Sequence, residues 1–160
     1  MMKKFLSIAM IVALVGVLAA CGDKSKEANK PTATEAPTKE SKSKVTTAQQ
    51  LAEKFKQEGL EVGEIRKMEA QDYGIIPKTA KEGIRVFTPS LGEDAGGRVM
   101  LFDKEDELSK VKEAYDNMGK QSALFFSHTY AKGNFLLQMT GEMKEDQFKK
   151  YQDVMDKAID

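Results

Sequence analysis

The order of hydrophobic and polar positions divides the chain into three parts. Residues 5–20 carry no charge and follow Lys3 and Lys4. Residues 22–45 contain no aromatic residue and, before Val45, no aliphatic side chain larger than alanine. Residues 46–160 hold eleven of the twelve aromatic residues and show patterns typical of helices and strands. We therefore expect a single folded domain over 46–160.

The first helix of that domain is predicted directly after residue 46. Thr47 and Gln50 have the spacing of a capping box, in which each side chain satisfies a backbone N–H at the start of a helix. Leu51 and Phe55 follow four positions apart and share one face. Gly59 provides a stop, because glycine tolerates the left-handed conformation that commonly ends helices.

Two more helices are predicted from stripes of apolar positions at helical spacing. One begins at an Asp103 cap, has Glu105–Glu107 in its first turn and stops at Gly119. The other closes the sequence. The two stripes are Leu108, Val111, Tyr115 and Met118, and Phe148, Tyr151, Met155 and Ala158.

Between the helices, runs rich in β-branched and aromatic residues predict five strands, at 60–65, 84–88, 98–102, 123–130 and 135–140. The last four form two hairpins, and the stretch 62–81 otherwise has no clean period. Hairpins without helical crossovers imply an antiparallel sheet. The sequence therefore predicts an α+β domain of about five strands with three helices packed on one face.

The second hairpin raises a question about its two faces. Setting Tyr130 opposite Phe135 and His128 opposite Leu137 makes one face almost wholly apolar, and we expect the helices to cover it. The reverse face then carries Phe125 and Leu136 among polar side chains. Three interpretations remain open. The two side chains are isolated exposed residues, or the segment 62–81 covers them, or they bind a partner. Phe125 and Leu136 are thus hypothetical partner-binding residues.

Composition removes several classes of function. The 25 basic and 25 acidic side chains cancel, so nothing favours a nucleic-acid partner. The single cysteine and single histidine exclude a disulfide framework, a zinc site with several cysteines and a redox CxxC. His128 shares its side of a strand with apolar residues, which favours a structural role over a catalytic one. We expect no cofactor, no metal and no catalytic residue.

The apolar run ends in a more specific pattern. Leu18-Ala19-Ala20-Cys21 resembles the lipobox of bacterial lipoproteins. That resemblance implies that residues 1–20 are a cleaved signal peptide and that Cys21 receives a diacylglycerol and a palmitate-type chain. The run of sixteen residues is also shorter than the roughly twenty that cross a bilayer, which disfavours a transmembrane anchor. We expect a protein anchored by lipid to the cell membrane, on its extracytoplasmic face.

Residues 21–45 are then the acylated cysteine and a tether. Lys, Ser, Thr, Glu and Pro dominate this segment, which has too little apolar surface to offset the entropy of ordering it. A spacer of about 25 residues has a root-mean-square span of about 25–30 Å. The domain is expected to stay near the membrane and to move within the envelope.

The layout of lipobox, polar tether and small domain resembles small surface lipoproteins of Gram-positive bacteria. The stretches 89–98 and 132–139 are similar to those of lipoproteins carried by mobile elements, some of which act in exclusion by blocking a conjugation channel. We expect a non-enzymatic protein whose secreted domain binds an envelope macromolecule, with a protein partner favoured. The alternatives are an envelope hydrolase with an unidentified carboxylate site and a sensing or solute-binding module.

The predicted lipid anchor is tested at Cys21, whose sulfur atom is the expected site of lipid attachment. Because the thiol of Cys21 is the only sulfhydryl group in the chain, Cys21→Ser should abolish acylation and leave the protein uncleaved or shed. Labelling with a palmitate analogue, followed by membrane fractionation, measures both effects. Continued incorporation of the label into the Cys21→Ser variant would refute the lipoprotein assignment.

Overall fold

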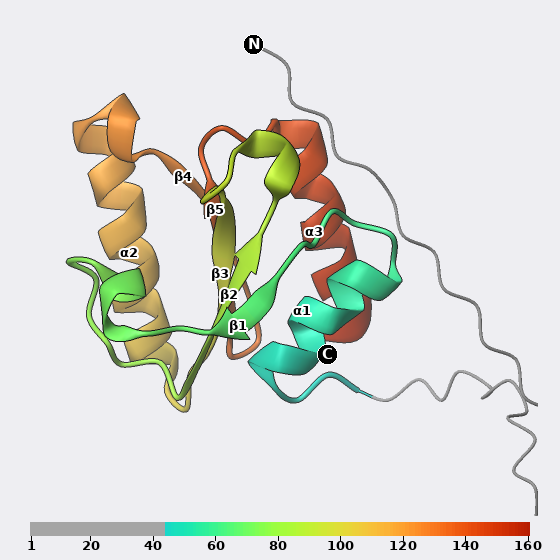
Figure 1. The fold of residues 1–160 in the computed structure, drawn as a ribbon. Helices are drawn as coiled ribbons and strands as arrows, with labels where there is room; N and C mark the ends of the chain where they lie inside the picture. The colour runs from blue at the N-terminus through green and yellow to red at the C-terminus, as the bar shows by residue number, and fades with distance from the viewer. Residues whose placement is uncertain (1–43) are drawn as a thin grey trace, which may run out of the picture. The chain divides into compact units, whose positions relative to one another are not determined.

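Residues 44–160 are described by the structure, a computed structural model (Figure 1). The predicted signal peptide, Cys21 and the predicted tether up to residue 43 lie outside these residues. Val45, the last residue assigned to the tether, is buried in the domain core. The ordered domain therefore includes at least one residue before the expected start at 46.

Five antiparallel strands form one sheet in the order β1-β2-β3-β5-β4. The strands are β1 (Ile65–Lys67), β2 (Glu82–Phe87), β3 (Gly96–Leu101), β4 (Ser127–Lys132) and β5 (Phe135–Thr140). The predicted α+β class and the five-stranded antiparallel sheet are confirmed. The first predicted strand, at 60–65, instead forms at β1: Gly63 and Glu64 already hydrogen-bond to Phe87 at the end of β2, but the regular pairing with β2 begins at Ile65.

Three α-helices pack on the sheet: α1 (Ala48–Gln57), α2 (Glu105–Gln121) and α3 (Glu145–Ala158). Short 3-10 turns occur at η1 (Ala70–Tyr73), η2 (Pro89–Leu91) and η3 (Ala123–Phe125). The capping box of α1 is present as predicted, with Thr47 Oγ1 accepting from the backbone N–H of Gln50 at 3.1 Å. Gly59 follows the helix with φ of 78°, which confirms the predicted stop.

The ends of α2 differ from the prediction. Asp103 does not cap the helix, because its carboxylate binds Lys81 at 2.8 Å, and Lys104 occupies the N-cap position. Gly119 does not end the helix either, since α2 continues to Gln121. A Cβ at Gly119 would come within 3.2 Å of the Phe126 backbone, so this glycine allows close packing rather than termination.

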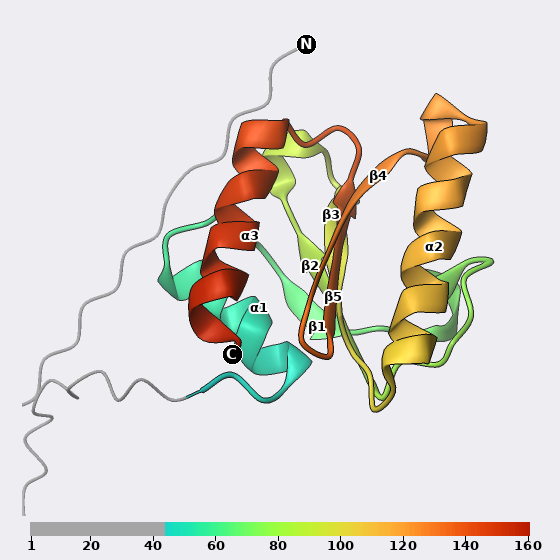
Figure 2. The ribbon, with the colours of Figure 1, turned by 180° about the vertical axis from the view of Figure 1, so that it is seen from behind.

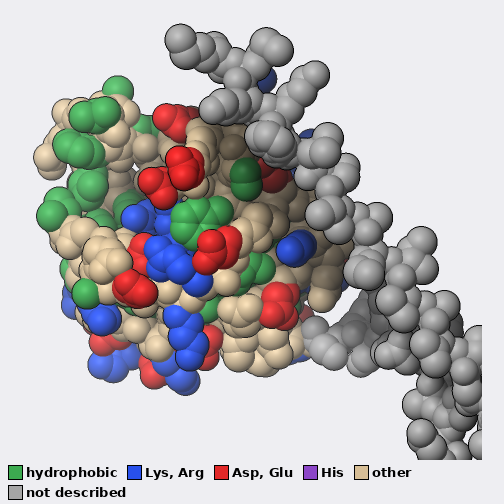
Figure 3. Space-filling model, in the orientation of Figure 1, with side chains coloured by type: hydrophobic (Ala, Val, Ile, Leu, Met, Phe, Trp, Pro, Cys, Tyr) green, Lys and Arg blue, Asp and Glu red, His purple; other side chains and the backbone are tan. Residues whose placement is uncertain are grey.

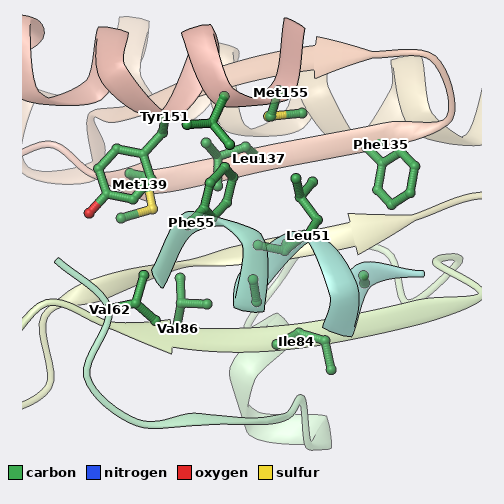
Figure 4. Close-up of a cluster of buried hydrophobic side chains, with 14 of the residues drawn as sticks. Leu51, Phe55, Val62, Ile84, Val86, Phe135, Leu137, Met139, Tyr151 and Met155 are labelled. Carbon is green, nitrogen blue, oxygen red and sulfur yellow. The ribbon is translucent and has the colours of Figure 1, made fainter. Parts of the chain in front are cut away.

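The helices lie on both faces of the sheet, which corrects the prediction that all three share one face. Figures 1 and 2 show α1 and α3 on one side of the sheet and α2 on the other. Each side has its own apolar cluster. Leu51, Phe55, Leu137 and Met155 belong to the cluster under α1 and α3 (Figure 4).

The second cluster lies between α2 and the opposite face of the sheet. Its buried members are Ile76, Met100, Phe102, Leu108, Val111, Tyr115 and Leu136. Burying both faces explains why four of the five successive buried positions of β5 are apolar, with Gln138 as the exception. The predicted stripe of α2 is correct, but it packs on the face that was expected to be free of helices.

The β4–β5 hairpin has the predicted faces where it forms strands and a different register, while residues 123–126, predicted as part of its first strand, lie in η3 and directly after it. Tyr130 lies opposite Leu137 and His128 opposite Met139, two residues away from the predicted pairing. Only Gly133 and Asn134 connect the strands, with φ of 52° at Gly133, and such two-residue turns match the twist of paired strands. Because the shift is an even number of residues, His128 and Tyr130 keep the face that was predicted.

Burial of both faces predicts similar costs for truncating neighbouring residues of β5. Leu136→Ala and Leu137→Ala should each lose about 2–5 kcal/mol of unfolding free energy, because both side chains are fully buried. The exposed Phe125 is the matched control, and Phe125→Ala should change stability by about 1 kcal/mol or less. Urea unfolding followed by circular dichroism measures the three values. Wild-type stability in Leu136→Ala would mean that α2 does not cover this face.

Candidate binding groove on the α2 face

An open groove of about 290 Å³ lies on the α2 side of the sheet. Its walls come from the η1 segment, from the loop between β2 and β3, and from the end of α2 with η3. Its floor is the middle of the sheet, where Arg85, Arg98 and Gln138 line the groove. Segments far apart in the sequence thus meet at one concave surface.

The rim of the groove is apolar. Four large hydrophobic side chains are exposed within residues 44–160: Ile75 at 84%, Leu124 at 85%, Phe125 at 55% and Phe126 at 48%. All four line this groove. Figure 3 shows hydrophobic side chains gathered over the end of α2 and the turn after it, next to basic side chains. Exposed apolar groups that collect at one concavity are typical of interaction sites.

The two residues predicted to bind a partner have different outcomes. Phe125 is exposed and lines the groove, whereas Leu136 is fully buried beneath α2 and is unable to contact a partner. Phe125 was expected on a strand, but in the structure it reaches the surface from the η3 turn. Ser122 Oγ accepts from the N–H of Leu124 at 3.3 Å and begins the η3 turn, which carries residues 123–125 off the sheet.

A row of polar side chains crosses the floor from strand to strand. Arg66 pairs with Arg85, Arg85 with Arg98, and Arg98 with Gln138 in successive antiparallel registers. Three guanidinium groups therefore lie on adjacent strands of the same face. Like charges directly opposite one another destabilise a sheet unless something neutralises them.

Arg66 is neutralised within the domain. Its Nη1 and Nη2 donate to the two carboxylate oxygens of Asp72 at 2.6 and 2.9 Å. The backbone N–H of Glu69 also donates to Asp72 at 2.7 Å. The Arg66 hydrogen bonds, followed by this backbone hydrogen bond, outweigh burial and lower the pKa of Asp72 to about 2. The pair anchors η1 to β1 and so sets one wall of the groove.

Arg85 and Arg98 have no such partner: within residues 44–160 neither forms an ion pair with a carboxylate. Arg85 donates to the carbonyl oxygens of Gly97 at 2.8 Å and Asp94 at 2.7 Å. Arg98 donates to the carbonyl of Asp72 and to Gln138 Oε1, both at 2.7 Å. Burial, and then the charge of Arg98, lower the pKa of Arg85. These contacts fix the guanidinium planes without cancelling their charge.

Among residues 44–160, two hydroxyl groups of groove-lining residues are buried without a hydrogen-bond partner. They belong to Tyr115 on α2 and Ser127 on β4, and both residues line the groove. Burial raises the pKa of Tyr115, while the charges of Arg98 and Arg85 act in the opposite direction. Both hydroxyls therefore have an unused donor, and that of Tyr115 lies within the electrostatic influence of the two arginines.

The single histidine lies away from the groove. His128 is buried on the other face, as predicted; its Nε2–H donates to the carbonyl of Met143 at 2.7 Å and its ring stacks on Phe148. Residues 44–160 contain no cluster of three or more metal-ligating His, Cys, Asp or Glu side chains. In the same range, no helix is long and apolar enough to span a bilayer.

The sequence analysis did not predict that the three arginines lie side by side, although the sequence contains a signal for it. Arg66, Arg85 and Arg98 are the chain's only arginines among 25 basic residues, and each falls in a strand. Arginine and lysine are not equivalent, because the guanidinium plane forms paired hydrogen bonds with oxyanions. The placement of all three arginines in strands is therefore a sequence signal for an oxyanion site on the sheet. Only the registers bring the three groups together.

Comparison of the chain with protein-family models, with curated proteins and with solved structures finds no match. The groove is therefore interpreted from its own residues.

The Asp72–Arg66 pair predicts a pH dependence of stability. Because folding lowers the pKa of Asp72 from 3.8 to about 2, the pair stabilises the fold above pH 4 and loses this effect as the pH falls toward 2. Asp72→Asn should cost about 1–2 kcal/mol at pH 7, a value reduced for the one-third exposure of Arg66. The difference between wild type and variant in urea unfolding should shrink below pH 4.

The exposed Lys81–Asp103 pair is the control for this effect. Asp103→Asn removes a carboxylate whose partner is about half exposed, so its cost should be about 1 kcal/mol or less. Equal costs for Asp72→Asn and Asp103→Asn at pH 7 would contradict the anchoring role of Asp72.

Proposed function

We propose that this chain is a lipid-anchored, extracytoplasmic binding protein whose groove holds a segment of a protein partner in the cell envelope. One observation carries the proposal: every exposed large hydrophobic side chain of residues 44–160 lines the same groove. Scattered exposure is ordinary on protein surfaces, whereas collection around one concavity is typical of binding sites.

The residues on the rim are suited to a protein partner. Leu124, Phe125 and Phe126 extend from a short turn, so an inserted apolar side chain would contact several of them at once. Buried aromatic anchors at the centre of an interface contribute most of the binding free energy in typical complexes. The proposed lipid on Cys21 and the tether would keep the groove near partners at the membrane.

The direction of the pKa shift of a carboxyl group beside the groove supports a binding function over hydrolysis. A carboxyl that donates a proton near neutral pH needs a raised pKa, which requires burial away from cations. The most strongly shifted carboxyl beside this groove, on Asp72, has its pKa lowered by Arg66. This argument favours the binding protein over the envelope hydrolase.

Site-specific cross-linking in the native envelope tests the proposal. A photoreactive benzoylphenylalanine in place of Phe125 should give a discrete protein adduct, and adding Leu124→Lys should abolish it. Leu124 is 85% exposed, so this change should leave the fold intact.

Lys149 on α3 is the matched control position, because it is exposed on a helix that covers the opposite face of the sheet. The photoreactive residue placed there should give no adduct of that mass. Identical adducts from both positions, or no protein adduct from position 125, would overturn the proposal.

A further inference from the structure

We infer that the floor of the groove is a carboxylate-binding subsite in which Arg85, Arg98 and Tyr115 hold an acidic group of the partner's peptide. This inference rests on the proposed function and specifies the chemistry of what the groove accepts. It concerns the polar floor, whereas the proposed function depends on the apolar rim.

The first argument is electrostatic. Arg85 and Arg98 lie directly opposite each other on β2 and β3. Within residues 44–160 neither forms an ion pair with a carboxylate, although the charges of Asp72 and Asp94 act on Arg85. The domain over 46–160 nevertheless has 21 acidic residues against 17 basic ones. Acids are plentiful in the domain, yet none forms an ion pair with this pair of cations. An arriving anion would relieve their mutual repulsion.

The second argument concerns geometry. The backbone carbonyls of Gly97, Asp94 and Asp72 each accept one hydrogen bond and hold the two guanidinium planes in place. Each guanidinium has five N–H donors, and only two are used by Arg85 and two by Arg98 in these contacts. Fixed planes with spare donors are arranged to bind oxyanions with little loss of entropy.

The third argument is the hydroxyl of Tyr115. Tyr115 is only 5% exposed, its hydroxyl oxygen is buried, and within residues 44–160 that oxygen has no hydrogen-bond partner. Leaving a buried donor unpaired is unfavourable, so a role in which a ligand completes the hydrogen bond is favoured. Tyr115 lines the groove together with both arginines, and a carboxylate on the floor would accept a hydrogen bond from this hydroxyl.

The apolar rim selects among oxyanions. A free inorganic anion would gain nothing from Leu124, Phe125 and Ile75, which stand next to the cations. A peptide that presents a carboxylate beside an apolar side chain would satisfy both parts of the groove at once. The carboxylate has two sources in a peptide, an acidic side chain or the C-terminus.

Isothermal titration of the full chain in a non-ionic detergent with four probes tests the inference. The probes are acetyl-Gly-Gly-Phe with a free carboxyl, the same peptide as an amide, acetyl-Gly-Glu-Phe-amide and inorganic phosphate. At least one carboxylate peptide should bind tenfold or more tightly than the neutral amide, and the tighter one identifies the source. Equal affinity of the amide, or binding of phosphate alone, would overturn the inference.

Tyr115→Phe removes only the unpaired hydroxyl. It should raise the Kd of the better carboxylate peptide about tenfold, leave the Kd of the amide unchanged and melt no lower than wild type. The matched control is Tyr151→Phe, whose hydroxyl donates to the Glu61 carbonyl on the other face at 2.7 Å. That variant should lose stability and keep the wild-type Kd. An unchanged Kd in Tyr115→Phe would refute the subsite.

The two proposals fail in different ways. Loss of carboxylate preference with an intact cross-link from position 125 removes the subsite and leaves the binding function. A carboxylate preference without any protein adduct keeps the subsite and removes the proposed protein partner.

Discussion

Strands β3 and β5 lie in the middle of the sheet and carry apolar side chains on both faces, so each face needs its own helical cover. Leu137 faces α1 and α3, while its neighbour Leu136 faces α2. A helix on one side alone would leave Met100 and Leu136 in water. This demand for cover on both faces determines where α2 packs, and the other features of the domain follow from it.

The cover provided by α2 is incomplete. The helix packs mainly against β4 and β5, at one end of the strand order. Within residues 44–160, the β1–β2 part of the same face has no α-helix above it, and there the sequence places Arg66 and Arg85 instead of apolar residues. The groove is the boundary between these two regions. Its polar floor and apolar rim are consequences of a sheet that is covered by a helix over only part of one face.

The walls of the groove differ in how firmly they are held. The η1 wall is fixed by the buried Asp72 and its paired hydrogen bonds with Arg66. The opposite wall is a short turn that follows α2, stabilised by Ser122 and by Phe126, whose ring packs edge-on against His128 at 5.0 Å. A rigid scaffold that presents side chains from loops is the usual design of a recognition surface. The inward-facing histidine thus supports the site without belonging to it.

Local patterns in the sequence were sufficient to predict the α+β class, the antiparallel hairpins, the capping box at Thr47 and the faces of β4 and β5. These features depend on neighbours within a few residues, so helical and strand periodicities reveal them directly. The end of α2 is an exception. Glycine at position 119 predicts the end of a helix, but in the structure Gly119 lies within the helix and allows close packing against Phe126.

The tertiary structure alone decided which face α2 covers, how the last hairpin is registered and whether Leu136 or Phe125 reaches solvent. An apolar stripe predicts that a helix packs against the sheet. It does not predict which face of the sheet, because burial on either face gives the same hydrophobic free energy. The arginine row is the clearest case. Arg66, Arg85 and Arg98 are separated by up to 32 residues, and only the strand registers, set by packing across the whole sheet, place their charges side by side.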